Sequence, residues 1–179
     1  MAKAEPAVAV HTLDVPGARL HYEVRGAGPL LLMIGSPMGA RGFEPIAALL
    51  AEDFTVVTYD PRGILNSTVD APDQQAGPEL LAQDVHGIIA ALDRGPAYVF
   101  GNSGGATTGV VLATRYPESV RALVAHEPPL LELLPDADLV RAAVDEICDT
   151  YECRRRGGVC CRPARVGPRE PRTLSRDVL

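Results

Sequence analysis

The segment GNSGG, residues 101–105, places a single serine, Ser103, between glycines where the apolar run YVF gives way to small residues. It fits the pattern G-x-S-x-G. A serine lifted on a sharp turn from strand to helix takes a strained backbone conformation, so residues two positions before and after it must be small. The first N–H groups of the following helix then face the oxyanion that forms in acyl transfer. The pattern predicts a nucleophile at Ser103; the alternative is a glycine-rich packing turn.

The segment MIGSPMG, residues 33–39, is a second candidate part of the same site, because it follows a continuous apolar run. A tetrahedral oxyanion needs two backbone N–H donors, one from the residue after the nucleophile and one from an earlier loop. Gly104 and Ser36 are the candidate oxyanion donors. The alternative is an ordinary turn between a strand and a helix, where Gly and Pro are common.

A serine hydroxyl is a weak nucleophile unless a base takes its proton. The chain has four histidines, and only His126 ends an expected strand beside the one that carries Ser103. His126 is therefore the candidate base. The alternative is a structural histidine at a strand end, because a base must reach the serine oxygen and be oriented by a third group.

The elements that must position these residues alternate between strand and helix patterns. A hairpin is expected over 11–15 and 19–24, because β-prone runs flank Pro16 and Gly17. Further strands are expected at 29–34, 54–59, 97–101 and 120–127, and helices at 43–53, 78–93 and 105–116, with a long polar loop at 60–78. This alternation predicts the α/β class with a mostly parallel central sheet.

Charge and periodicity divide the chain near residue 150. Residues 1–150 carry 9 basic and 20 acidic side chains, and a helical pattern beyond residue 128 holds Val140, Ala143, Val144 and Ile147. Residues 151–179 carry 8 arginines against 3 acids and show no apolar period. We expect one domain over 1–150 and a disordered basic tail over 151–179. The other interpretation of the tail is a nucleic-acid arm, but no aromatic residues are interleaved with its arginines, so no nucleic-acid partner is expected.

Composition sets the remaining expectations. The chain has 179 residues, 46% of them hydrophobic, and a net charge of −6, which suits one soluble globular core. It has no apolar run long enough to cross a membrane and no secretory signal pattern, so a cytoplasmic protein is expected, without a membrane partner. The four cysteines lack the paired spacing of zinc sites, and no metal is expected.

With these motifs the chain resembles the α/β-hydrolase superfamily over about residues 8–150. GNSGG is similar to its nucleophile elbow and IGSPMG to its oxyanion loop. VVTYDPRG matches the segment after its fourth strand, with Asp60, Arg62 and Gly63 at the D-x-R-G positions, and VRALVAHEPP is similar to the sixth strand and the start of a helical cap. The resemblance implies a serine hydrolase for a small carboxylic ester or related acyl substrate, without a cofactor. A serine at the elbow points away from the dehalogenase and epoxide-hydrolase branches, which use Asp there. Asp60 is expected to order the loop after its strand. The resemblance also makes Glu127 a candidate acid, because some members of the superfamily supply the acid after the sixth strand; the alternative is a glutamate that lines or braces the cap entrance.

The chain also departs from the family pattern. Ile34 stands where a histidine often braces the oxyanion loop, and no histidine follows His126. The resemblance therefore implies a C-terminally truncated chain whose sheet is incomplete on that side and whose activity is impaired or absent. The composition from about residue 153 onward resembles GC-rich coding sequence in a shifted frame. The alternative function is a non-catalytic remnant of the fold that binds a small molecule or a protein partner; the oligomeric state is left open.

Overall fold

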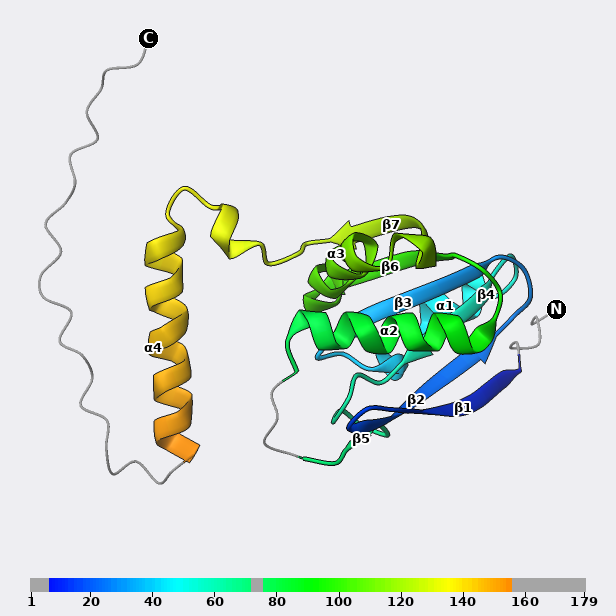
Figure 1. Ribbon diagram of the computed structural model, residues 1–179, viewed down its shortest axis with the longest axis horizontal. Helices are drawn as coiled ribbons and strands as arrows, with labels where there is room; N and C mark the ends of the chain where they lie inside the picture. The colour runs from blue at the N-terminus through cyan, green and yellow to red at the C-terminus, as the bar shows by residue number, and fades with distance from the viewer. Residues whose placement is uncertain (1–6, 72–75, 156–179) are drawn as a thin grey trace, which may run out of the picture. The chain divides into compact units, whose positions relative to one another are not determined.

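The computed structural model describes residues 7–71 and 76–155, and its internal contacts separate the chain into two units after Leu130 (Figure 1). The first unit holds the sheet and three α-helices. The second unit contains a 3₁₀ helix, Leu131–Leu133, and α4, Ala137–Arg155. Residue 150 lies inside α4, so the described part of this helix crosses the boundary predicted there. Residues 156–179, which make up most of the predicted tail, lie outside the described residues.

The sheet is mixed, and its parallel part carries the candidate site. Its strands are β1 (Val8–Val15), β2 (Ala18–Arg25), β3 (Leu30–Ser36), β4 (Thr55–Tyr59), β5 (Thr68–Val69), β6 (Ala97–Ser103) and β7 (Val120–His126). They run in the order β1-β2-β4-β3-β6-β7, with β5 paired to β2. The strands β4, β3, β6 and β7 are parallel, while β1 and β2 form the predicted antiparallel hairpin. The predicted α/β class is therefore confirmed.

Strand β3 lies in the middle of the sheet and shows how the core is built on both faces. Leu30, Leu32 and Ile34 pack into one buried cluster, and Leu31 and Met33 pack into another on the opposite face. Successive side chains of a strand point to opposite faces, so a continuous apolar run suits a strand that is covered on both. This two-sided burial makes β3 a central strand of the sheet unit.

Helices cover the two faces of the sheet separately. Helix α1 (Glu44–Leu50), with the 3₁₀ helix Ala40–Phe43 before it, packs against one face through Phe43 and Ala47. Helices α2 (Pro78–Leu92) and α3 (Gly104–Arg115) cover the other face (Figure 1). The apolar stripe of α2 is buried at its 3.6-residue period by Leu81, Val85, Ile88 and Ile89, and Pro78 occupies its first turn. The three helices therefore lie where the sequence periodicity predicts them.

The second unit is described by itself. Helix α4 carries apolar residues at helical spacing, and Leu139, Val144, Ile147 and Tyr151 are all exposed. Arg141 pairs with Asp138 on the same helix and with Glu132 in the segment before it. In the described residues no helix is both long enough and apolar enough to cross a membrane.

Candidate active site

Ser103 lies on a strained turn between β6 and α3. Its backbone angles are φ 54° and ψ −122°, and its side chain is exposed. A positive φ is uncommon for a residue with a Cβ and is maintained only where the surrounding structure demands it. The last residue of the strand and the residue before the helix are here the same, which leaves no room for a relaxed connection.

The flanking glycines allow this turn because side chains would collide there. A Cβ on Gly101 would lie 2.6 Å from the carbonyl oxygen of Gly105, and a Cβ on Gly105 would lie 2.1 Å from that of Ile34. Both contacts are with backbone atoms, which cannot move aside as a flexible side chain can. The strand and the helix therefore approach more closely than any residue other than glycine permits, which is the physical reason for the G-x-S-x-G spacing.

Ser36 and Gly104, the predicted oxyanion donors, lie next to the serine. Ser36 ends β3 and is the register partner of Ser103 on β6. A Cβ on Gly104 would lie 3.1 Å from the Cβ of Ser36, so the two segments are in direct contact. Gly104 is the first residue of α3, and its N–H has no acceptor within the helix. The structure thus brings Ser103, Ser36 and Gly104 together at the carboxyl ends of two parallel strands.

His126 lies at the end of β7 and is the register partner of Asn102, the residue before Ser103. Its Nδ1 lies 2.8 Å from the Oδ1 of Asn102, and its ring stacks on Phe100 with centroids 6.3 Å apart. A carboxamide oxygen only accepts, so the contact is a hydrogen bond in the tautomer that carries its proton on Nδ1. In that tautomer Nε2 is the acceptor that a general base needs.

Glu127 follows β7 directly and is exposed, with a φ of 50°. Neither Glu127 nor His126 is hydrogen-bonded to the nucleophile: within residues 7–71 and 76–155 the Ser103 hydroxyl has no hydrogen-bond partner. The structure therefore groups the candidate site residues into two sets, Ser103 with its oxyanion donors and His126 with Asn102.

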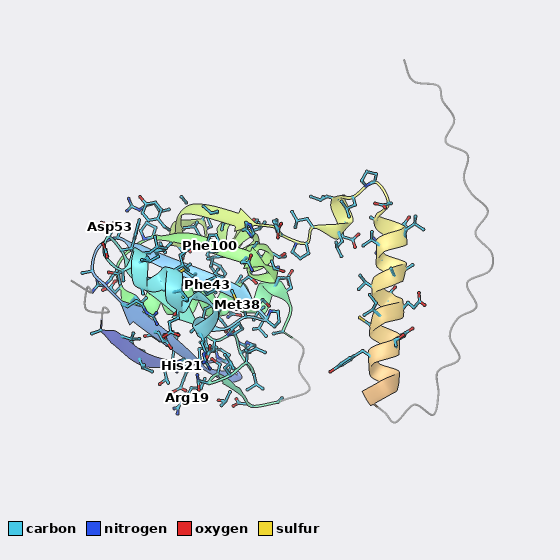
Figure 2. The ribbon with its side chains drawn as sticks, turned by 180° about the vertical axis from the view of Figure 1, so that it is seen from behind. Arg19, His21, Met38, Phe43, Asp53 and Phe100 are labelled. Atoms are coloured by element: carbon cyan, nitrogen blue, oxygen red, sulfur yellow. The ribbon has the colours of Figure 1, made fainter. Side chains whose placement is uncertain are left out.

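An apolar cluster lies on the α1 side of the sheet and contacts the His126 ring through Phe100. Figure 2 labels Met38, Phe43 and Phe100 of this cluster. Phe43 meets Phe100 edge to face, with ring centroids 6.3 Å apart, and Met38 packs against the same cluster. Met38 belongs to the loop after β3, and Phe43 ends the 3₁₀ helix that follows this loop. The loop after β3 is thus anchored in the core on one side of the sheet.

Two buried carboxylates lie near the D-x-R-G segment and have different partners. Asp60, directly after β4, accepts hydrogen bonds from the backbone N–H of Ala40 and from Asn66. Asp84 of α2 forms a bidentate ion pair with Arg62, with N···O distances of 2.7 and 2.5 Å. Asp60 does order the loop after its strand, as expected, but it also reaches the loop after β3.

The described residues contain no group of three His, Cys, Asp or Glu side chains that could hold a metal ion. Cys148 is exposed on α4 with a free thiol. Cys160 and Cys161 lie outside the described residues.

Sequence reasoning missed two contacts of this site, the Asn102–His126 hydrogen bond and the Asp60–Ala40 hydrogen bond. The sequence held a signal for the Asn102–His126 contact. Phe100 and Asn102 are two residues apart and so lie on the same face of β6, beside the strand that His126 ends. The second joins two loops that are 20 residues apart, and no local pattern marks it.

Comparison with known proteins gives a consistent result. Residues 28–150 match the family model described as the alpha/beta hydrolase fold. The chain is 43% identical over 132 residues to the uncharacterized hydrolase YraK of Bacillus subtilis (strain 168), covering 73% of this chain and 49% of that protein. It is 34% identical over 114 residues to the 2-(acetamidomethylene)succinate hydrolase of Mesorhizobium japonicum, covering 63% of this chain and 40% of that protein.

A solved structure of a putative epoxide hydrolase from Pseudomonas aeruginosa is also similar, with a TM-score of 0.64 and 27% identity, covering 84% of this chain and 58% of that chain. The chain spans about half the length, or less, of the two curated relatives.

Proposed function

The chain belongs to the α/β-hydrolase fold family, and from this premise we propose that it is a serine hydrolase for a small carboxylic ester or a related acyl compound. The observation that carries the proposal is the backbone of Ser103, which is held at φ 54° with its side chain exposed beside Ser36. Conformational strain of this kind persists at functional sites because the surrounding structure supports it. The related proteins are hydrolases, which supports the reaction class.

The proposed reaction is acyl transfer to Ser103. The Oγ of Ser103 attacks the carbonyl carbon, its proton passes to a base, and the carbonyl oxygen becomes an oxyanion held by the N–H groups of Ser36 and Gly104. The tetrahedral intermediate collapses with cleavage of the bond to the leaving group, which takes up the proton. Water then attacks the acyl-serine, releases the carboxylic acid and restores the hydroxyl.

The nature of the nucleophile favours acyl substrates over epoxides. In the family that the elbow resembles, epoxide hydrolases and dehalogenases carry an aspartate at the position of Ser103. A serine oxygen attached to an acyl carbon is released by water through an oxyanion that the two backbone donors stabilise. The similarity to a putative epoxide hydrolase therefore supports the shared fold, and Ser103 supports the acyl chemistry.

We propose His126 as the candidate base and Glu127 as the candidate acid. His126 is supported by its hydrogen bond to Asn102, which orients the ring and leaves Nε2 free to accept a proton. A shift of the ring or of the serine would have to bring Nε2 to the Ser103 hydroxyl, a tightening that catalytic hydrogen bonds often show only with substrate bound. His126→Ala and Asn102→Ala should then both lower the rate of acylation.

The decisive experiment is labelling with a fluorophosphonate probe, which forms a covalent bond only with an activated serine. Wild type is compared with Ser103→Ala and with Ser119→Ala, a matched control because Ser119 is a buried serine bonded to His86. The proposal expects labelling of wild type and of Ser119→Ala and none of Ser103→Ala. Equal signals in wild type and Ser103→Ala would show that Ser103 is not activated.

The second candidate function is a non-catalytic protein that binds a small molecule or a protein partner. The observation that favours it is the hydroxyl of Ser103, which has no hydrogen-bonded base among the residues that the structure describes. Binding of a carboxylic acid that is unchanged by Ser103→Ala, together with no labelling of wild type, would support this function over hydrolysis.

A further inference from the structure

Asp60 is a buried carboxylate that joins the loops after two neighbouring strands, β3 and β4. Asp60 is 1% exposed and lies directly after β4. Its Oδ1 accepts the backbone N–H of Ala40 at 2.8 Å. Its Oδ2 accepts the backbone N–H of Asn66 at 3.1 Å and the Nδ2 of Asn66 at 3.0 Å. One carboxylate thus holds the loop after β3 with one oxygen and the loop after β4 with the other.

The loop that carries Ser36 is closely fitted to this carboxylate. A Cβ on Gly39 would lie 2.3 Å from the Oδ1 of Asp60, so the loop backbone passes directly over the oxygen. Ala40 is the first residue of the 3₁₀ helix that closes the loop, and its N–H is one that a helix start leaves without an internal acceptor. Asp60 supplies that acceptor, and the path of the backbone between Ser36 and Ala40 is fixed at this end by the bond.

The second oxygen maintains a strained turn. Leu65, directly before Asn66, has a φ of 49° although it carries a bulky side chain, and the Asn66 N–H beside it is held by Asp60. Such a conformation is costly and needs external support. The Cδ1 of Leu65 would lie 2.7 Å from a Cβ on Gly39, so this turn packs against the loop of Ser36.

The partners of Asp60 distinguish it from the neighbouring buried acid. Asp84 is paired with the guanidinium of Arg62, whereas the side-chain contacts of Asp60 among the described residues are all with uncharged N–H groups. Burying a carboxylate is costly unless hydrogen bonds replace its hydration. These three bonds therefore connect the two loops rather than neutralise a basic side chain.

We propose that Asp60 is a positioning residue for the oxyanion hole: through Ala40 it sets the place of the Ser36 N–H relative to Ser103. It acts on the backbone donor and does not touch the substrate. This role rests on the proposed function, but the effect of Asp60 on the order of the loop after β3 can be measured without substrate.

The test uses the full chain and three variants. Asp60→Asn removes the charge and replaces one of the two accepting oxygens by an NH₂ group, which cannot accept the hydrogen bonds made there. Ala40→Pro removes the N–H that Asp60 accepts and points its ring Cδ at the carboxylate, and Gly39 before it is already in the extended conformation that precedes proline, with φ −90° and ψ −172°. Asn66→Ala is the matched control, because it removes one bond to the other oxygen of Asp60 and leaves the Ala40 bond in place.

The first measurement is amide hydrogen exchange over residues 35–43. Exchange should become at least about tenfold faster in Asp60→Asn and Ala40→Pro and should stay within about twofold of wild type in Asn66→Ala, with α2 unchanged in all three. The second measurement is the saturation kinetics of fluorophosphonate labelling. In the first two variants kinact should fall by about tenfold, with KI nearly constant, because misplacing one oxyanion donor costs less than deleting it.

The outcomes separate the two proposals. Unchanged exchange in Ala40→Pro and Asp60→Asn overturns the role of Asp60, whatever the labelling shows. Faster exchange with unchanged kinact overturns it as well, because the loop would then be disordered without effect on the donor. Absence of Ser103-dependent labelling in wild type overturns the proposed function alone, and the exchange result still decides whether Asp60 sets the loop.

Discussion

Ser36 and Ser103 are register partners at the carboxyl ends of β3 and β6, and Gly104 packs directly against Ser36. Main-chain pairing of β3 with β6 thus brings Ser36 next to Ser103 and Gly104. Gly104→Ala tests this arrangement, because the new methyl group would lie 3.1 Å from both the Cβ and the carbonyl oxygen of Ser36. We expect labelling of Ser103 to slow by about tenfold with a loss of stability below about 1 kcal/mol, since the neighbour need move only slightly. Labelling kinetics and urea denaturation measure the two effects, and an unchanged labelling rate would argue against the donor role of Gly104.

The positive φ of Ser103 predicts a gain in stability when the strain is removed. Ser103→Gly should be more stable than Ser103→Ala by about 1 kcal/mol, because a strained φ costs a residue with a Cβ more than glycine loses in chain entropy. Both variants lack the hydroxyl, so their difference reports the backbone alone. Thermal denaturation measures it, and equal midpoints would mean that the turn is not strained.

A methyl group at Gly105 should destabilise the protein. In Gly105→Ala the Cβ would lie 2.1 Å from the carbonyl oxygen of Ile34, so α3 must move away from β3, at a cost of about 3 kcal/mol. Gly87→Ala is the control within α2. Its nearest contact would be 3.6 Å, and replacing a glycine inside a helix should stabilise the protein by about 1 kcal/mol. Denaturant unfolding of both variants checks the contrast in sign.

Because Arg62 and Asp84 form a buried ion pair, the free energy of unfolding should depend strongly on whether both are present. The side chains are 4% and 2% exposed, so Asp84→Leu alone leaves a buried, unpaired guanidinium and should cost about 3 to 5 kcal/mol. The double variant Arg62→Met with Asp84→Leu should recover most of this loss, because no charge remains buried. A double-mutant cycle on unfolding free energies gives the coupling, and strictly additive effects would contradict it.

Tyr59 predicts a loss of stability at alkaline pH. Burial raises the pKa of its hydroxyl, the charge of Asp84 raises it further, and Arg62 opposes this rise. The folded protein therefore keeps a proton that the unfolded chain loses above about pH 10, so the stabilisation is complete below that pH and declines above it, by at most about 1.4 kcal/mol per pH unit. Tyr59→Phe should show a flatter decline between pH 9.5 and 11 than wild type.

The same variant should not be less stable at neutral pH. In the described residues the Tyr59 hydroxyl is buried without a hydrogen-bond partner, and removing such a group can stabilise a protein by about 1 kcal/mol. Urea denaturation at pH 7 and at pH 10.5 measures both effects. A parallel decline of wild type and Tyr59→Phe would rule out this source of the pH dependence.

Local patterns predicted the elements of the sheet unit because each pattern has a physical cause that acts over a few residues. The apolar run of β3 reflects burial on both faces, and the stripe of α2 reflects burial on one. The turn at Ser103 was marked by its glycines for the same reason, since the close approach of strand and helix excludes side chains. The short strand β5 was missed, because two residues inside a polar loop carry no periodicity.

Contacts between distant loops could not be predicted in this way. Asp60 was expected to order its own loop, but which second loop it reaches depends on the packing of β3 beside β4. The pairing of Asn102 with His126 requires that β6 and β7 are neighbours and also that they pair in the correct register. A shift of one residue would turn these side chains to different faces. Both contacts are properties of the assembled sheet.

The pairing of β3 with β6 has a consequence for how the molecule folds. The hairpin β1–β2 closes over a two-residue turn, whereas β3 and β6 are separated by α1, β4, β5 and α2. Closing such a long loop carries an entropic cost that local hairpins avoid, so this pairing belongs to the slow, non-local part of folding. Ser36 and Ser103 become neighbours only when that step is complete. During refolding, reactivity of Ser103 should therefore return with the last protected amides of the sheet, which makes the serine a chemical reporter of completed folding.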